Sequence, residues 1–350
     1  MYRKIMGFLE AWKDSVHRKP LILQGARQVG KTYSILEFGR THYENVAYFN
    51  FETNPKLNET FEENISPDYL IPILSHIAGQ TIVTEKTLIV FDEVQLCERA
   101  LTSLKYFCEN APDYHIIVAG SLLGVAVNRA KFSFPVGKVD MKTLYPMDME
   151  EFMLALGEDD LVEQIKKCFQ TDTPLPSALH DAAMQLYRQY LVVGGMPECV
   201  MQFAETKDYI LVRHTQDTIL ASYLNDMSKY NNLNEIKKTR LAYDNITVQL
   251  SKKNTRFQYK LIKQGGRASE FENAIEWLCL SGIVSQVYKV EQIKKPLENY
   301  RDIDAFKIYV SDLGLLCAKK DLVANDILYM VEELNDFKGG MTENYVNVQL

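Results

Sequence analysis

Two glycines, a lysine and a threonine lie close together near the N-terminus, in the stretch GARQVGKT. Gly25, Gly30, Lys31 and Thr32 satisfy the spacing GxxxxGK[ST], in which glycines let the main chain curl until its N–H groups point at phosphate oxygens. The lysine then bridges the β- and γ-phosphates, and the hydroxyl binds Mg²⁺. We therefore predict a loop that binds ATP and Mg²⁺. Its predicted contacts are Gly25, Gln28, Val29, Gly30, Lys31, Thr32 and Tyr33.

Two acidic residues, Asp92 and Glu93, directly follow the apolar run LIVF. A carboxylate at the end of a neighbouring parallel strand can hold Mg²⁺ through a water, and we assign that role to Asp92 together with Thr32. Glu93 can accept a proton from an attacking water. No NKxD guanine-recognition motif occurs, so the pair predicts ATP hydrolysis, with Lys31 and Glu93 in catalysis. Two surface acids after a strand are the weaker alternative.

Further polar residues could complete this site. Ser121 ends the run IIVAGS and could donate to the γ-phosphate or the lytic water, which makes it a third candidate catalytic residue. It could equally cap the helix that LLGVAV predicts, and both interpretations stay open. A cation is needed for transition-state charge, and Arg27, Arg129 and Lys138 are the candidates among which the sequence does not choose.

The elements that must position these residues alternate between strands and helices. Apolar or β-branched runs predict strands at 21–23, 46–51, 87–91, 115–119 and 136–144, and helical spacing predicts helices at 31–40 and 98–109. Alternating strands and helices imply a parallel sheet covered on both faces, the three-layer α/β fold of P-loop NTPases. This fold places the loop and both acids at the same edge of the sheet.

The rest of the chain has a different pattern. Residues 159–225 predict helices alone, interrupted by glycines and a proline in VVGGMPECV. From about 234 to 319, short helices precede two predicted strands at 283–290 and 306–310, which is typical of a winged helix. The final stretch, MTENYVNVQL, still predicts helix without a stop signal, so we expect the chain to be truncated relative to its relatives.

Charge, composition and cysteine spacing limit the classes of protein to which this chain could belong. The formal charge of −7 at pH 7, with 47% hydrophobic and 24% charged residues, is ordinary for a folded water-soluble protein. The six cysteines form no CxxC pair and indicate reduced core thiols rather than a zinc site. The N-terminus lacks the features of a signal peptide, and the longest uncharged stretch, 116–127, is too short to span a bilayer. We expect a cytoplasmic protein without a membrane partner.

One basic segment stands out in this acidic chain. Residues 251–269 contain Lys252, Lys253, Arg256 and Lys260 without any acidic residue before Glu270. Such a cluster can neutralise phosphates of duplex DNA. A solvated helix face explains the same charges, and the sequence leaves both interpretations open.

Taken together, several stretches resemble the bacterial and archaeal AAA+/STAND-like ATPases that carry an AAA_14 ATPase domain and a DUF4143 C-terminal domain. The stretches are GARQVGKT, LIVFDEVQ, GSLLG, VGKVDMKTLYPMDMEEF, VVGGMPECV and KIYVSDLGLL. The resemblance implies an ASCE/AAA+-like ATPase core at 1–155, a helical lid at 156–232, a winged-helix-like domain at 233–320 and the start of a nuclease-like region at 321–350. It places Glu343 where the first nuclease-fold helix begins, and the later nuclease motifs have no counterpart here.

The resemblance also carries expectations about partners. Many members have an arginine where this chain has Lys138 after Gly137, which removes the family's basis for an arginine finger there. Members of this group act across subunit interfaces, so the resemblance implies a homo-oligomer. The favoured function is an ATP-driven switch or remodeller that engages DNA or a protein. The alternatives are a non-hydrolysing ATP switch and a DNA-binding regulator with a vestigial nucleotide pocket.

Overall fold

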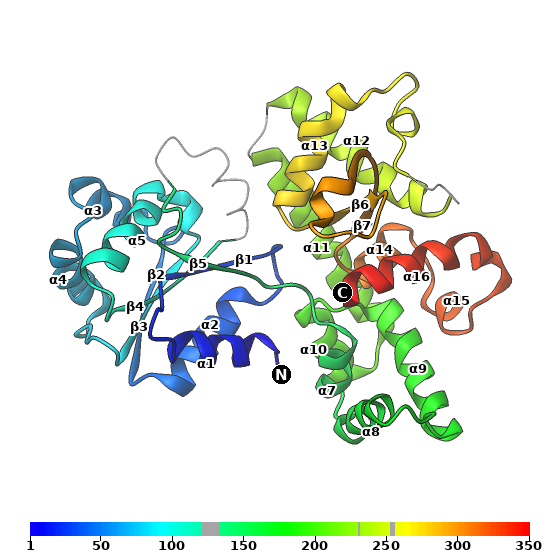
Figure 1. Ribbon diagram of the computed structural model, residues 1–350, viewed down its shortest axis with the longest axis horizontal. Coiled ribbons are helices and arrows are strands. Elements are labelled where there is room, and N and C mark those ends of the chain that lie inside the picture. Colours follow the sequence, from blue (N-terminus) through cyan, green and yellow to red (C-terminus); the bar gives the residue numbers. More distant parts are fainter. Residues whose placement is uncertain (121–133, 230–231, 253–255) are drawn as a thin grey trace. The chain divides into compact units, whose positions relative to one another are not determined.

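The computed structural model describes residues 1–120, 134–229, 232–252 and 256–350 (Figure 1). Ser121, Arg129 and Lys253, which the sequence singled out, lie outside the described residues. Contacts divide the chain into two compact units, Arg3–Tyr145 and Pro146–Leu350, the second joined by Met1–Tyr2. The second unit thus begins earlier than the boundary expected after residue 155.

The first unit is built on a five-stranded parallel sheet. Its strands are β1 (Leu21–Gln24), β2 (Asn45–Asn50), β3 (Thr87–Asp92), β4 (His115–Ala119) and β5 (Asp140–Thr143), in the order β2-β3-β4-β1-β5. The parallel sheet expected from the alternating pattern is confirmed. The last strand is shorter than 136–144, because the Lys138 N–H donates to the Pro135 carbonyl and turns the chain there.

Helices cover both faces of this sheet. They are α1 (Ile5–Lys13), α2 (Lys31–His42), α3 (Leu57–Glu63), α4 (Pro67–Ala78) and α5 (Glu98–Asn110), with a short 3₁₀ turn η1 (Val94–Leu96). Ile89 and Phe91 pack among residues of α3, α4 and α5, whereas Leu88 on the opposite face lies below α2 close to Gly39. Successive strand residues point to opposite faces, so a fully apolar strand such as β3 is buried on both sides. The predicted three-layer arrangement is confirmed.

The second unit begins with helices only. They are α7 (Met149–Ala155), α8 (Asp159–Gln170), α9 (Ser177–Val193), α10 (Pro197–Thr206), α11 (Tyr209–Lys229), α12 (Leu233–Leu250) and α13 (Ala268–Leu280), with the 3₁₀ turn η2 (Tyr259–Leu261) after α12. The helix α7 packs on α8, α9 and α10, which explains why residues after 145 belong to this unit. Its capping box, in which the Asp148 carboxylate accepts from the Glu151 N–H, marks its start.

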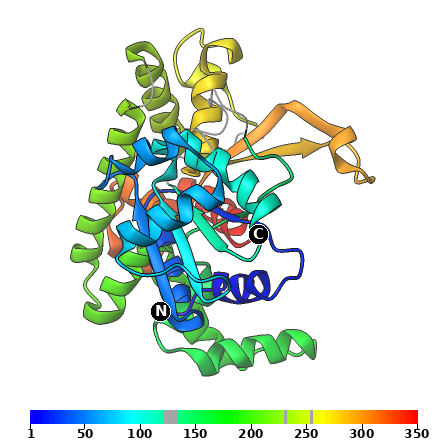
Figure 2. The same ribbon diagram turned by 90° about the vertical axis from the view of Figure 1, so that its left-hand side faces the viewer.

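A small antiparallel hairpin follows the helices, as in a winged helix. It pairs β6 (Val284–Val290) with β7 (Arg301–Val310), joined through the 3₁₀ turn η3 (Leu297–Tyr300). The strand β7 begins at Arg301 rather than at 306, because the hairpin extends past the helices that it packs on. Figure 2 shows this extension, coloured orange. The predicted helical region with a following two-stranded hairpin is confirmed.

The last residues belong to this second unit. They form α14 (Leu313–Lys319), α15 (Ala324–Leu328), η4 (Glu332–Leu334) and α16 (Asn335–Gln349). The helix α16 contacts α12, α14 and β7, and its Gln349 side chain accepts from the Met149 N–H. Residues 321–350 were expected to start a separate nuclease-like region, but within them α15 packs on α9 and α16 packs on α12, α14 and β7. Among the described residues, no helix is long and apolar enough to cross a bilayer.

Candidate functional site

The loop between β1 and α2 has the backbone that the motif requires. Gly25 has φ +147° and Gly30 has φ +89°, and the exposed Gln28 between them also has a positive φ. A Cβ atom on Gly25 would lie 2.1 Å from the Leu144 carbonyl oxygen, so no other residue fits there. The first N–H groups of α2 have no acceptor within the helix and can point at an anion.

A buried arginine, Arg3, donates hydrogen bonds to this loop and to the segment after β5. Arg3, only 5% exposed, donates one hydrogen bond to the Val29 carbonyl at 3.0 Å and another to the Tyr145 carbonyl at 2.7 Å. The Leu144 N–H donates to the Gln24 carbonyl at 2.8 Å. These hydrogen bonds connect the loop and β1 to residues 144–145, where the first unit ends. Sequence reasoning missed Arg3, because nothing in the charged N-terminal stretch distinguishes it.

Lys31 is buried in the loop. Its ammonium donates to the carbonyls of Gly25 at 2.9 Å and Ala26 at 2.8 Å, and the residue is 7% exposed. Burial lowers the pKa of Lys31 from 10.5 to about 8, against the opposing charges of Glu93 and Asp92. The cation is therefore held close to both acids at a cost in desolvation, which negative phosphates would offset.

Asp92 accepts hydrogen bonds from three directions. Its Oδ2 accepts from the Thr32 hydroxyl at 2.9 Å and from the Tyr48 hydroxyl at 2.7 Å, and its Oδ1 accepts from the Glu93 N–H at 3.0 Å. The expectation that Asp92 ends a strand neighbouring the one before the loop is wrong, because β4 lies between β1, which leads into the loop, and β3, which ends in Asp92. Tyr48 on β2 was missed in the sequence, where it reads as one residue of an ordinary strand. Burial, above all, raises its pKa to about 12 and keeps it a donor.

The pair Thr32 and Asp92 fits Mg²⁺. Both offer oxygen, the donor type that Mg²⁺ prefers, and Mg²⁺ in proteins usually keeps several waters and binds through only one or two side chains. The Thr32 Oγ1 and Asp92 Oδ2 atoms are separated by 2.9 Å. Among the described residues no group of three or more His, Cys, Asp or Glu side chains could hold a metal alone. A two-residue site that is completed by phosphates and waters agrees with both observations.

Glu93 lies at the tip of β3 in a left-handed conformation, with φ +51°. Such a backbone is uncommon for a residue with a side chain and tends to occur at functional sites. The Gln95 amide donates to the Glu93 carboxylate. Glu93 is partly exposed and acts electrostatically on Lys31, so the structure brings it together with Lys31, Thr32 and Asp92.

The remaining candidates around the loop have different positions. Arg27 lies in the loop and also acts on the Lys31 pKa, lowering it. Lys138 forms an exposed ion pair with Glu109 at 2.9 Å, so that contact competes with a role at the phosphates. Tyr33 lies in the first turn of α2, where its N–H has no acceptor within the helix, and it is 58% exposed.

The basic segment belongs to the second unit. Lys252, Arg256 and Lys260 are exposed, and their side chains make no hydrogen bond or ion pair with any described residue. Lys263 instead pairs with Glu270 at 3.3 Å. One cation of the basic segment 251–269 is thus neutralised within the protein.

Family comparisons agree with this division of the chain. Residues 17–153 match a family described as an AAA domain (AAA_14), and residues 184–326 match a domain of unknown function, DUF8612. Residues 17–153 are thus similar to AAA-type P-loop ATPase domains, and residues 184–326 are similar to DUF8612 domains. The expectation of a DUF4143 domain is corrected by this match. None of the curated proteins matches the chain.

Solved structures share the fold at low identity. The Walker-type ATPase PABY2304 of Pyrococcus abyssi is 13% identical, with a TM-score of 0.56 over 91% of this chain and 95% of that one. The ORC2 protein of Aeropyrum pernix is also 13% identical, with a TM-score of 0.45 over 94% and 95% of the two chains. At such identity, the first likeness supports the fold alone.

Proposed function

We propose that this protein binds ATP with Mg²⁺ and hydrolyses it. The observation that carries the proposal is the grouping of Lys31, Thr32, Asp92 and Glu93 around one glycine-shaped loop. A buried lysine with unpaired helical N–H groups beside it suits a triphosphate, and the Thr32–Asp92 pair suits its metal.

Each residue has a role that follows from its position. Lys31 would exchange its two carbonyl acceptors for phosphate oxygens, and the N–H groups of the first turn of α2 would hold the same phosphates. Thr32 and Asp92 would hold Mg²⁺, which supplies positive charge to the phosphates when bound. Glu93 would accept the proton of the attacking water, because its carboxylate is partly exposed beside the ion-holding acid.

Hydrolysis can be tested with two substitutions and one control. Purified protein should release phosphate from ATP in the presence of Mg²⁺, and Lys31→Ala should weaken nucleotide binding because it removes the buried cation. Glu93→Gln should keep ATP binding and lose at least about a hundredfold of the turnover, the usual contribution of a general base. Glu85→Gln is a matched control, since Glu85 also has a positive φ of 63° but lies on the surface.

The competing function is a switch that binds ATP without hydrolysing it. Equal phosphate release by the wild type, Glu93→Gln and Glu85→Gln would remove Glu93 as the base and favour that switch. Unchanged ATP affinity in Lys31→Ala would instead support the third function, a regulator with a vestigial pocket, and would refute the proposal.

Duplex DNA is a second candidate partner, acting on the second unit. Lys252, Arg256 and Lys260 are exposed cations without partners among the described residues, and such charges contact phosphates. Lys253 would extend the same cluster. Fluorescence anisotropy of a labelled duplex at rising salt measures this binding, and Lys260→Gln should lower the salt dependence by about one ion. Absence of binding near physiological salt would refute it.

We also propose that the protein forms a homo-oligomer, as ATPases that share a site between subunits do. Light scattering with and without MgATP measures the assembly. A monomer at micromolar concentration under both conditions would contradict it.

A further inference from the structure

The edge strand β2 carries two polar side chains, Tyr48 and Asn50, on one face. Alternate residues of a strand point to the same side of the sheet. Phe49, between them, belongs to the core on the side of α3, α4 and α5. Val46 has the same parity as Tyr48 and lies against Gly39 of α2. Tyr48 and Asn50 are therefore on the side of the sheet that α2 covers, the helix that begins at the nucleotide loop.

Asn50 fixes the direction in which the Tyr48 hydroxyl donates. The Asn50 Oδ1 atom accepts from the N–H groups of Glu52 and Thr53, both at 2.9 Å. Its Nδ2 atom is thus the end that donates to the Tyr48 oxygen, at 3.2 Å. The hydroxyl has a single proton to donate, and it goes to the Asp92 Oδ2 atom at 2.7 Å. Tyr48 is therefore held as a donor to Asp92.

The donors around Asp92 occupy most of its acceptor positions. An ionised carboxylate offers about four such positions, two on each oxygen. The Thr32 and Tyr48 hydroxyls take both positions on Oδ2, and the Glu93 N–H takes one position on Oδ1. The described donors therefore leave one position, on Oδ1.

The position that remains on Asp92 suits a contact with a cation through a water. A carboxylate that binds a cation with both oxygens needs a free position on each oxygen, and Oδ2 has none left. Mg²⁺ usually keeps several waters, whereas Ca²⁺ takes about six to eight oxygens and can use both oxygens of a carboxylate. With its oxygens occupied in this way, Asp92 favours Mg²⁺ over Ca²⁺.

We propose that Tyr48 determines the metal selectivity of the nucleotide site. Its hydroxyl occupies one position on the Asp92 Oδ2 atom and so prevents this carboxylate from binding a cation with both oxygens. Tyr48 is a positioning residue, because it acts through Asp92. The inference rests on the proposed binding of ATP with Mg²⁺, and it adds the residue that selects the ion.

Tyr48→Phe tests this role, because it keeps the ring and frees one position on Oδ2. The measured quantity is the ratio of two dissociation constants of a non-hydrolysable ATP analogue, one with excess Ca²⁺ and the other with excess Mg²⁺. In the variant this ratio should fall at least about fivefold, the free energy of about one hydrogen bond. The affinity for the analogue in a chelator should not change, because Asp92 holds the metal rather than the phosphates.

Mn²⁺ provides a direct count of waters in the same site, since it takes the same oxygen ligands as Mg²⁺. Pulsed electron paramagnetic resonance in H₂O and D₂O counts the water ligands of Mn²⁺ bound with the ATP analogue. Tyr48→Phe should show fewer water ligands than the wild type, because an oxygen of Asp92 takes the place of a water. Equal numbers in the two proteins would overturn the proposal.

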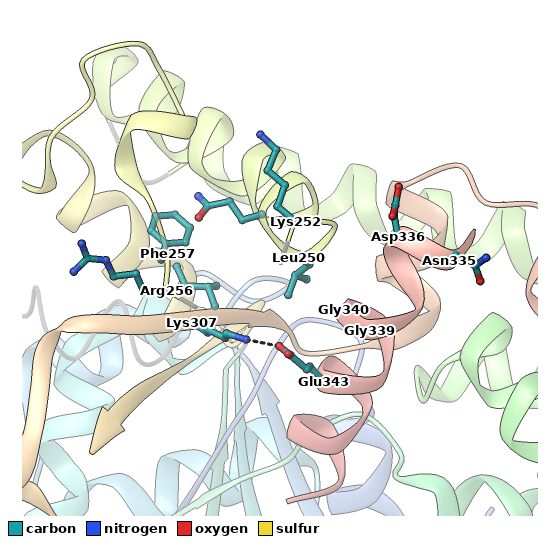
Figure 3. A pocket seen from close by; sticks show the side chains of 12 residues that line it. Leu250, Lys252, Arg256, Phe257, Lys307, Asn335, Asp336, Gly339, Gly340 and Glu343 are labelled. Carbon is teal, nitrogen blue, oxygen red and sulfur yellow. Dashed lines mark hydrogen bonds and ion pairs between the residues drawn. The ribbon is translucent and has the colours of Figure 1, made fainter. Parts of the chain in front are cut away.

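Two other tyrosines provide matched controls. Tyr69 of α4, in the same unit, donates to the Glu63 carboxylate. Tyr309 of β7 donates at 3.3 Å to the Glu343 Oε2 atom, which also accepts from Lys307 at 2.6 Å (Figure 3). Tyr69→Phe and Tyr309→Phe each remove a hydroxyl from a carboxylate and should leave the ratio of dissociation constants unchanged. An equal fall of the ratio in Tyr48→Phe and in either control would contradict the proposal.

The outcomes separate this inference from the proposed function. A wild type that shows no metal-dependent affinity for the analogue would refute the proposed function, and this inference with it. A wild type that binds the analogue with Mg²⁺, and a ratio that Tyr48→Phe leaves unchanged, would refute the role of Tyr48 alone. Equal weakening of binding by Tyr48→Phe with Mg²⁺, with Ca²⁺ and in the chelator would show a merely structural role and would also overturn the inference.

Discussion

Replacing Lys31 by methionine should stabilise the protein without nucleotide and abolish its response to ATP. A fall in the Lys31 pKa from 10.5 to about 8 means that the folded state disfavours the ammonium by about 3 kcal/mol relative to the unfolded chain. Methionine keeps much of the buried stem but leaves the Gly25 and Ala26 carbonyls without their donor. The net gain at pH 7 should therefore be about 1–2 kcal/mol, a rise in thermal midpoint of a few degrees.

The difference in stability between Lys31→Met and the wild type depends on pH, and the pKa shift of Lys31 fixes the sign of that dependence. Between about pH 8 and 10.5 the unfolded chain binds the Lys31 proton and the folded protein does not, so wild-type stability rises with pH in that window. The advantage of Lys31→Met should be constant below about pH 8 and shrink toward pH 10.5. With MgATP at a hundred times its Kd, the wild type should gain about 2.7 kcal/mol and the variant nothing.

Thermal denaturation at pH 7, 9 and 10, with and without MgATP, measures the stability gain of Lys31→Met, its dependence on pH and the stabilisation by MgATP. Lys56→Met is the control, because this exposed lysine of the same unit has no partner among the described residues. A variant that melts below the wild type at pH 7, with a gap independent of pH, would refute the assignment of Lys31 as a strained, buried cation.

Three further outcomes follow from individual contacts. Gly25→Ala should reduce ATP affinity at least tenfold, roughly one lost charge-assisted hydrogen bond, because its methyl group would meet the Leu144 carbonyl; isothermal titration measures it. Arg3→Met should lower the free energy of unfolding by about 2–3 kcal/mol, since the Val29 carbonyl loses a buried donor, and denaturant unfolding that is unchanged would contradict this. Burial raises the pKa of Asp312 to about 6. Stability should consequently fall as pH rises from about 4 to 6, where the folded state holds the extra proton, and Asp312→Asn should flatten that slope in denaturant melts.

The sequence alone predicted several features that are specified by residues close together in the chain. The spacing of Gly25, Gly30, Lys31 and Thr32 predicts a loop that the structure contains, because the curl of a loop depends on the conformations of successive residues. The runs around 87–91 and 115–119 predict buried parallel strands, because apolar β-branched stretches have few other stable environments. The sequence also predicted that helices precede a two-stranded hairpin in the second unit, and the structure has this order.

Only the tertiary structure decided which distant residues meet. Arg3 contacts Val29, Tyr48 contacts Asp92, and β4 separates β1 from β3, all through contacts between segments far apart in the sequence. Asn344, 34 residues beyond Val310, bonds to the Val310 main chain for the same reason. Such pairings depend on how whole elements pack, and the free energy of that packing is spread over many side chains rather than concentrated in a short pattern.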